Sequence, residues 1–112
     1  MKTLEELTQL LIKFRNDRDW SQFHNSKDLA LALSIEAAEL NELFLWKSEK
    51  EAENINKVRL GEELADVLAY ALLLAEKNDL NIEEIVRNKI NLNAGKYPIH
   101  KAKGTSEKYT EL

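Results

Sequence analysis

Cysteine is absent from the 112-residue sequence, and glycine and proline are scarce, with three residues and one residue respectively. The absence of cysteine excludes disulfides, zinc–thiolate sites and thiol nucleophiles. So little glycine and proline, beside abundant Leu, Ala, Glu and Lys, favours helices over strands. Basic residues are not in excess either: 16 Lys and Arg stand against 20 Asp and Glu, a net charge of −4. This balance argues against binding to nucleic-acid polymers or to membrane surfaces.

Long hydrophobic runs are missing as well. No segment approaches the roughly 18 apolar residues of a membrane span, and the N-terminus lacks the apolar stretch of a signal peptide. We therefore expect a soluble, cytoplasmic protein. The length suits a single domain, which we assign to residues 1–100. Residues 101–112 are polar, and alone they would form a flexible C-terminal tail.

Apolar periodicity predicts four helical segments. They cover residues 3–15, 26–46, 58–77 and 81–95. Ser26 is the expected N-cap of the second segment, and Asn81 with Glu84 caps the fourth. Residues 47–57 are polar and indicate a loop with at most a frayed helical turn. The expected fold is all-α, a four-helix bundle completed by assembly into a dimer or tetramer.

Two pairs of acidic residues interrupt the apolar faces of the second and third helices. Helical geometry places Glu36 within an apolar stripe and Glu39 at its edge. Glu63 and Asp66 lie within about 60° of each other and of Tyr70, again among apolar neighbours. A charge that faces a core costs several kcal/mol unless it is paired or binds a metal. The pattern predicts a metal site, with surface acids or lysine-paired acids as the alternative.

Histidine is too rare and too badly placed for a di-iron centre. Such bundles pair Glu with His on their helices, whereas His24 and His100 both lie outside the two acidic helices. Carboxylates brought together repel one another, and hard divalent cations with oxygen ligands relieve that repulsion. We therefore expect Mg²⁺, with Mn²⁺ as a possible substitute.

Polar residues also interrupt the apolar arc of the fourth helix, where Lys89, Asn93 and Lys96 occur. Two lysines and an amide on one face suit a polyphosphate, whose charge the metal would help to neutralise. In the alternative interpretation these lysines extend to solvent or pair with the inward acids.

Aromatic residues flank the proposed carboxylate cluster. Trp46 follows Glu39 by seven residues, about 20° around a continuous helix, and Tyr70 lies one turn after Asp66. A planar base could stack there, although core or interface packing would explain the same rings. Trp20 and His24 lie in an otherwise polar connection, which indicates that they pack against something.

Together these residues resemble the MazG-like, all-α NTP pyrophosphohydrolases. The E-x-x-E and E-x-x-D pairs correspond to the metal-binding signature of that superfamily. The resemblance is strongest to the dCTP pyrophosphatase branch, and it extends from Leu4 to the last residue. The matching segments are 18–24, Trp46-Lys47, 89–98 and the ending 108–112.

The resemblance implies a nucleotide pyrophosphohydrolase that forms a monophosphate and pyrophosphate. It implies Mg²⁺ ligands at Glu36, Glu39, Glu63 and Asp66. We expect one of Glu36 and Glu39 also to serve as general base. The implied substrate contacts are Trp20, Trp46 and Tyr70 to the base or sugar, and Lys89, Asn93, Lys96 and Tyr97 to the phosphates. His24 completes the set of substrate-binding candidates.

The implied substrate is dCTP or a C5-modified pyrimidine deoxynucleotide. Leu11 replaces a polar residue expected in the base pocket, and the 47–57 connection is shorter than in the animal dCTP enzymes. Both differences concern which base the site would select. Hydrolysis of dUTP or phosphoribosyl-ATP is the alternative within enzymes, and a non-enzymatic helical interaction module is the alternative outside them. The family also implies a homodimer or homotetramer, which suits the apolar outer side of the second helix. That side carries Leu31, Ile35, Ala38 and Leu45.

Overall fold

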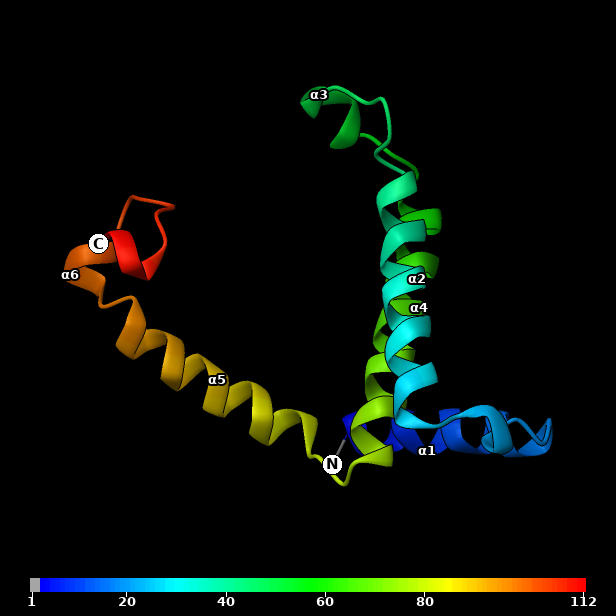
Figure 1. Cartoon of the computed structure of the whole chain (residues 1–112). Helices are drawn as coiled ribbons and strands as arrows, with labels where there is room; N and C mark the ends of the chain where they lie inside the picture. Colours follow the sequence, from blue (N-terminus) through cyan, green and yellow to red (C-terminus); the bar gives the residue numbers. More distant parts are fainter. Residues whose placement is uncertain (1–2) are drawn as a thin grey trace. The chain divides into compact units, whose positions relative to one another are not determined.

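Residues 3–112 are described by a computed structural model in which every regular element is helical (Figure 1). The prediction of an all-α fold is therefore confirmed. In chain order the elements are α1 (Thr3–Asp17), η1 (Ser21–Phe23), α2 (Ser26–Glu42), α3 (Glu49–Ala52), α4 (Lys57–Lys77), α5 (Ile82–Lys96), α6 (Ile99–Ala102) and η2 (Tyr109–Glu111). They fall into two compact units that meet in sequence between Leu80 and Asn81. Among the described residues, every helix is too short or too polar to cross a membrane.

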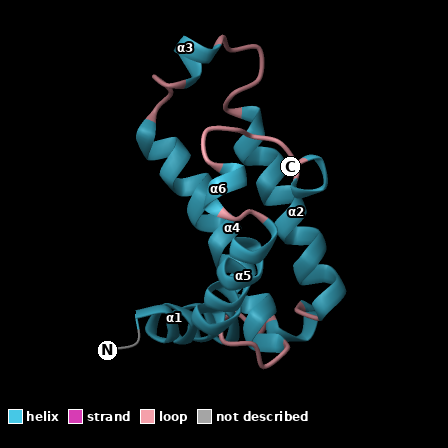
Figure 2. Ribbon diagram, turned by 90° about the vertical axis from the view of Figure 1, so that its left-hand side faces the viewer, coloured by secondary structure: helices cyan, strands magenta, loops and turns pink. Residues whose placement is uncertain are grey.

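The first unit is built on α2 and α4, which lie side by side and run in opposite directions (Figure 1). The helix α1 packs on α4, across the end of the pair that is farther from α3 (Figure 2). The buried side chains gather toward this end, at the beginning of α2 and the end of α4. They are Leu29, Leu72, Leu73 and Ala75. The core is therefore small, and it fixes the end of the pair where α1 crosses.

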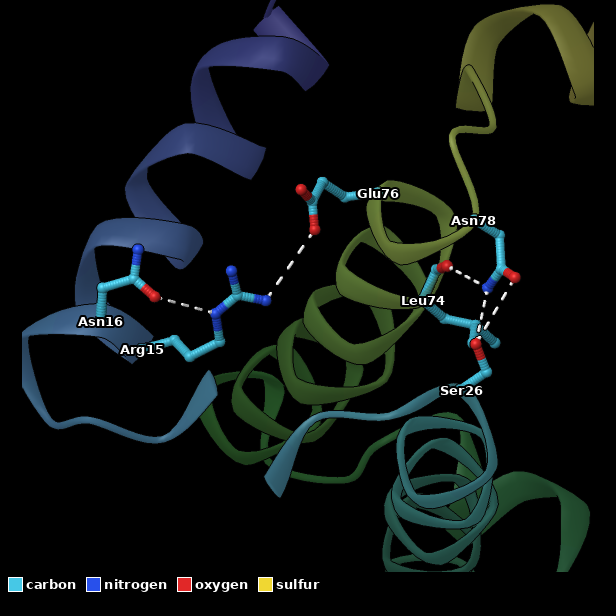
Figure 3. A network of polar contacts seen from close by, with 6 residues as sticks. All are labelled: Arg15, Asn16, Ser26, Leu74, Glu76 and Asn78. Carbon is cyan, nitrogen blue, oxygen red and sulfur yellow. Dashed lines mark hydrogen bonds and ion pairs between the residues drawn. The ribbon is translucent and has the colours of Figure 1, made fainter. Parts of the chain in front are cut away.

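A set of polar contacts reinforces the same end (Figure 3). The Asn78 Nδ2 donates to the Leu74 carbonyl at 2.9 Å and to the Ser26 Oγ at 3.1 Å, which joins the end of α4 to the beginning of α2. We call this contact the Ser26–Asn78 clamp. A second contact links α1 to α4, because the Arg15 Nη1 lies 3.8 Å from the Glu76 Oε2. Together they hold α1 and α2 on α4.

Both predicted ends of the second helix differ from those observed. The N-cap is Asn25, not Ser26: the Asn25 Oδ1 accepts from the Asp28 N–H at 2.9 Å, which leaves the Ser26 hydroxyl for the clamp. The helix ends at Glu42, four residues before the predicted end at Trp46. Tight turns follow it, and the chain then enters α3 through a capping box of Ser48 and Glu51. The prediction that residues 26–46 form one helix was therefore wrong at its C-terminal end.

Burial of α4 is incomplete, although the helix is rich in apolar residues. Leu72, Leu73 and Ala75 near its C-terminus are buried, but Val58, Leu64 and Leu68 are 45–70% exposed. Of the described elements of the first unit, α2 and then α1 make the most extensive contacts with this helix, and these contacts leave several of its apolar side chains exposed. On α2, Leu31 and Ile35 are exposed as the outward-facing pattern predicted. The four-helix bundle and its completion by assembly stay predictions.

The second unit consists of α5, α6 and η2. Asn81 caps α5 as predicted, since its Oδ1 accepts from the Glu84 N–H at 2.9 Å. The segment 101–112, expected to be a flexible tail, contains the end of α6 and all of η2. Gly104 adopts a φ of +83°, a conformation that glycine takes without strain, and the chain turns there.

Candidate functional site

Three of the four predicted metal ligands come together between α2 and α4. Glu36, Glu39 and Glu63 each offer a carboxylate oxygen, and these oxygens lie within 4.8 Å of one another. The i, i+3 spacing puts the first two on one face of α2, and the antiparallel neighbour α4 supplies the third. Glu36 and Glu63 are half-buried, and Glu39 is exposed. We call these three residues the carboxylate cluster.

Asp66 lies one turn after Glu63 on α4 and is exposed, outside the three-residue cluster. Its negative charge nevertheless acts on the cluster, since it contributes to the raised pKa of both Glu36 and Glu63. The structure thus brings Asp66 near the predicted ligands without bringing its oxygens into the same group.

The carboxylate cluster is electrostatically strained. A hydrogen bond shared with the Glu39 side chain, followed by burial and by the charges of the neighbouring acids, raises the pKa of Glu36 to about 7. Burial and then the Glu39 charge raise the pKa of Glu63, against the opposing charge of Arg59. The group thus resists carrying its full negative charge at neutral pH.

Two buried oxygens in the cluster lack partners. The Oε2 atoms of Glu36 and Glu63 are inaccessible to solvent and accept no hydrogen bond within residues 3–112. Buried polar atoms normally have a partner, so orphaned ones point to a group that belongs beside them. A set of carboxylate oxygens alone suits a hard divalent cation such as Mg²⁺ or Mn²⁺. The residues present therefore fit the predicted metal.

Tyr70 and His24 form an aromatic pair beside the cluster. Their ring centroids lie 6.5 Å apart with the planes inclined at 62°. Burial, and then the charges of Glu36 and Asp66, raise the pKa of Tyr70, so the phenol lies close to the acids. Burial and then the Arg15 charge lower the pKa of His24, and its buried Nδ1 has no hydrogen-bond partner within residues 3–112. Tyr70 thus contacts His24 and also lies near the carboxylates.

The two tryptophans lie differently from the predicted helical positions. Trp20 packs edge-on against Phe14, with ring centroids 5.8 Å apart. Trp46 lies beyond the end of α2, with a φ of +63° and a side chain that is 92% exposed. The argument that placed it two turns above Glu39 on a continuous helix was therefore wrong. A positive φ is rare for a bulky residue, and such strain concentrates at functional positions.

In the second unit, Lys89 and Asn93 share one face of α5. They border an open hollow of about 440 Å³. Its other lining residues are Ile85, Val86 and Ile90. A cation and an amide thus rise from an apolar floor, as the interrupted arc predicted. Lys96 and Tyr97, at the end of the same helix, contact Tyr109 instead.

Two features of the structure were missed by the sequence interpretation, namely the Ser26–Asn78 clamp and the contact of Tyr109 with the end of α5. The clamp joins residues far apart in the chain, and nothing local distinguishes them. Tyr109 did carry a signal, because it is an aromatic residue in a polar segment that matches the family pattern.

An antiparallel helix pair that gathers carboxylates from both partners defines an all-α protein with a candidate site for a divalent cation. Comparison with known proteins narrows this class. The chain belongs to the MazG-like family, which it matches over residues 31–112, so the predicted resemblance is confirmed.

Named relatives lie close to this chain. It is 40% identical to dCTP pyrophosphatase 1 of Rattus norvegicus and 41% identical to that of Homo sapiens, over 98% of this chain and 68% of each relative. A solved structure, a pyrophosphatase from Archaeoglobus fulgidus, is similar with a TM-score of 0.83 and 40% identity. That similarity covers 88% of this chain and 94% of the other.

Proposed function

We propose that the protein hydrolyses a nucleoside triphosphate to the monophosphate and pyrophosphate, with dCTP or a related pyrimidine deoxynucleotide as substrate. The observation that carries this proposal is the carboxylate cluster in a chain of the MazG-like family. Relatives named dCTP pyrophosphatase 1 support both the reaction and the base. The structural relative named as a pyrophosphatase supports the reaction.

The proposed cofactor is Mg²⁺, which Mn²⁺ can replace, and the proposed ligands are Glu36, Glu39, Glu63 and Asp66. The unpartnered Oε2 atoms of Glu36 and Glu63 support this assignment, as does the absence of any donor but oxygen in the cluster. When bound, the cation would supply positive charge to offset that of the phosphate oxygens.

In the proposed reaction, the oxygen of a water molecule attacks the α-phosphorus. The bond from that phosphorus to the oxygen bridging the α- and β-phosphates breaks, and pyrophosphate leaves with the bonding electrons. The water gives up a proton, for which Glu36 and Glu39 are the candidate acceptors because both lie in the cluster.

The proposed substrate contacts are the residues that the family resemblance implies, together with His24. We propose that Lys89, Asn93, Lys96 and Tyr97 contact the phosphates. We propose that Trp20, His24, Trp46 and Tyr70 contact the base or sugar. The pairing of His24 with Tyr70, and the nearness of Tyr70 to the acids, support this assignment on the side of the first unit.

Assembly into a homodimer or homotetramer is part of the proposal. Leu31 and Ile35 of α2, and Leu64 and Leu68 of α4, are each 45–57% exposed. This much apolar surface on one small unit is typical of a protein that buries it against a second copy. The cytoplasmic location expected from the sequence stays a prediction.

The proposal is tested by pyrophosphate release across a panel that includes dCTP, 5-methyl-dCTP, dUTP, phosphoribosyl-ATP and the common ribonucleotides. We expect the highest kcat/KM with a cytosine deoxynucleotide, loss of activity in excess EDTA, and recovery with Mg²⁺ or Mn²⁺. Preference for dUTP or phosphoribosyl-ATP would reassign the base and leave the reaction in place. Absence of pyrophosphate release from every nucleotide would refute the enzyme and favour an interaction module.

A matched pair of variants tests the metal ligands. Glu63→Gln should lower kcat/KM by about 100-fold or more, because loss of even an outer-shell partner of a metal ligand costs 10–100-fold. Glu62→Gln removes the same charge from the adjacent, exposed position and should leave activity nearly unchanged. Calorimetric titration with Mg²⁺ should show binding to Glu62→Gln and not to Glu63→Gln. Equal activity in the two variants would contradict the assignment.

A further inference from the structure

The C-terminal segment returns to the end of α5. The chain turns at Gly104, and the Thr105 N–H donates to the Ala102 carbonyl at 3.1 Å. The Glu107 N–H then donates to the Thr105 Oγ1 at 3.2 Å, which steadies the turn. The short helix η2 follows, with Tyr109 as its first residue. The last part of the chain thus has a defined path.

Tyr109 contacts two consecutive residues at the end of α5. Its ring centroid lies 5.9 Å from that of Tyr97, with the ring planes inclined at 79°. The Lys96 Nζ lies 4.9 Å from the same centroid, within the range of a cation–π contact. The Tyr97 N–H donates to the Asn93 carbonyl at 2.8 Å, so the helix fixes the backbone at this point. The Tyr109 ring therefore contacts the side chains of both Lys96 and Tyr97.

This contact matters because Lys96 is exposed and its side chain is long. A free lysine side chain samples many rotamers, and fixing it for a ligand costs conformational entropy. The carbonyls at the end of a helix also attract a cation, and Lys96 lies in the last turn of α5. A ring that holds the ammonium in one place before the ligand arrives reduces the entropy cost of binding. It also keeps the ammonium from turning toward the helix carbonyls.

We propose that Tyr109 is a positioning residue of the nucleotide site, which holds the Lys96 ammonium and the Tyr97 ring where the phosphates bind. The inference rests on the proposed function, because that function assigns Lys96 and Tyr97 to the phosphates. Tyr109 acts through these two residues and does not itself contact the substrate. The segment 101–112 is thereby part of the site.

The test compares variants of Tyr109 in the full chain by steady-state kinetics with dCTP and Mg²⁺. Tyr109→Ala should raise KM by about three- to tenfold, the effect of losing a cation–π contact and an aromatic pair, while kcat stays within about twofold. Tyr109→Phe keeps the ring and should restore KM to near that of the unaltered protein. Thr110→Ala, at the neighbouring exposed position, is the matched control and should change nothing.

Two further variants separate positioning from general structural support. Tyr109→Leu fills similar apolar space without an aromatic face, so it should keep the melting temperature and still raise KM. In a Lys96→Ala background, where KM is already raised, Tyr109→Ala should add less than about twofold, because residues that act through one another are not additive.

Several results would overturn the inference. They are an unchanged KM in Tyr109→Ala, an equally raised KM in Tyr109→Phe, a fall in kcat alone, or a Tyr109→Leu variant with normal KM. In each of these the unaltered protein is active, so the proposed function survives. An unaltered protein that hydrolyses no nucleotide would refute the proposed function, and this inference with it.

Discussion

Replacing Glu39 by Gln should stabilise the metal-free protein, because Glu39 is the largest cause of the raised pKa of Glu36. A carboxyl whose pKa is raised by folding adds stability that is complete below its unfolded pKa of 4.5 and is lost as the pH rises through about 7. Metal-free protein should therefore become less stable between these pH values. The amide of Glu39→Gln carries no charge and can donate to an ionised Glu36, so this loss should shrink.

The size of the effect follows from the pKa. One pKa unit corresponds to about 1.4 kcal/mol, so a rise from 4.5 to about 7 sets an upper limit of about 3.5 kcal/mol. Glu36 is only half-buried, and solvent screening reduces this figure to about 1–2 kcal/mol. For a domain of this length, that free energy corresponds to a shift in Tm of roughly 4–8 °C.

The assay is thermal unfolding in EDTA, followed by circular dichroism at several pH values. At pH 8 we expect Glu39→Gln to melt above the unaltered protein by this amount, and the difference should vanish near pH 4.5. Glu42→Gln is the matched control, since it removes a charge from an exposed position on the same helix. Adding Mg²⁺ should raise the Tm of the unaltered protein more than that of Glu39→Gln. A Tm for Glu39→Gln at or below that of the unaltered protein, or an equal rise in Glu42→Gln, would refute the reasoning.

Two further predictions concern the substrate. Lys89→Ala should weaken triphosphate binding by about tenfold with little effect on nucleoside binding, since the lysine binds an anionic group. The control is Arg87→Ala, because the Arg87 side chain pairs with Glu83 on the same helix. Calorimetry measures binding to both variants. Unchanged triphosphate binding would contradict the phosphate contact and favour the interpretation that Lys89 extends to solvent. Trp46→Ala should raise the KM for dCTP by about tenfold, as loss of base stacking does, while light scattering shows an unchanged assembly. A dissociated variant, or an intact one with unchanged KM, would reject stacking.

The sequence predicted the features of this fold that depend on neighbouring residues. Helical periodicity alone puts Glu36 beside Glu39, and it puts Glu63 on an apolar face of the next long helix. The observed cluster needed only the further step that these helices are antiparallel neighbours. The cap at Asn81 was equally local, since its side chain bonds a backbone group three residues away.

Features that depend on distant contacts were not predictable. The position of Trp46 required the end of α2, which is set by the turns that lead to α3 and not by the apolar pattern. Burial of α4 depends on how much of its surface other helices cover. The apolar pattern alone does not determine this, and Leu64 and Leu68 are exposed. Tyr109 contacts Lys96 and Tyr97 because the chain turns at Gly104, and the polar sequence around this turn did not specify its path.

The Ser26–Asn78 clamp aligns α2 with α4 at one end of the pair, whereas the chain connects the two helices at the other end. Hydrogen bonds fix the register at one end, about three helical turns from Glu36, whereas the connection through α3 closes the other end. The clamp, together with the buried Leu29, Leu72 and Leu73, opposes sliding of one helix along the other. We therefore expect residues inserted or removed between α2 and α4 to leave the carboxylate oxygens in place and to alter mainly the end of the pair that carries Trp46. A change in the length of that connection should therefore alter the surface near Trp46 while the carboxylate cluster keeps its arrangement.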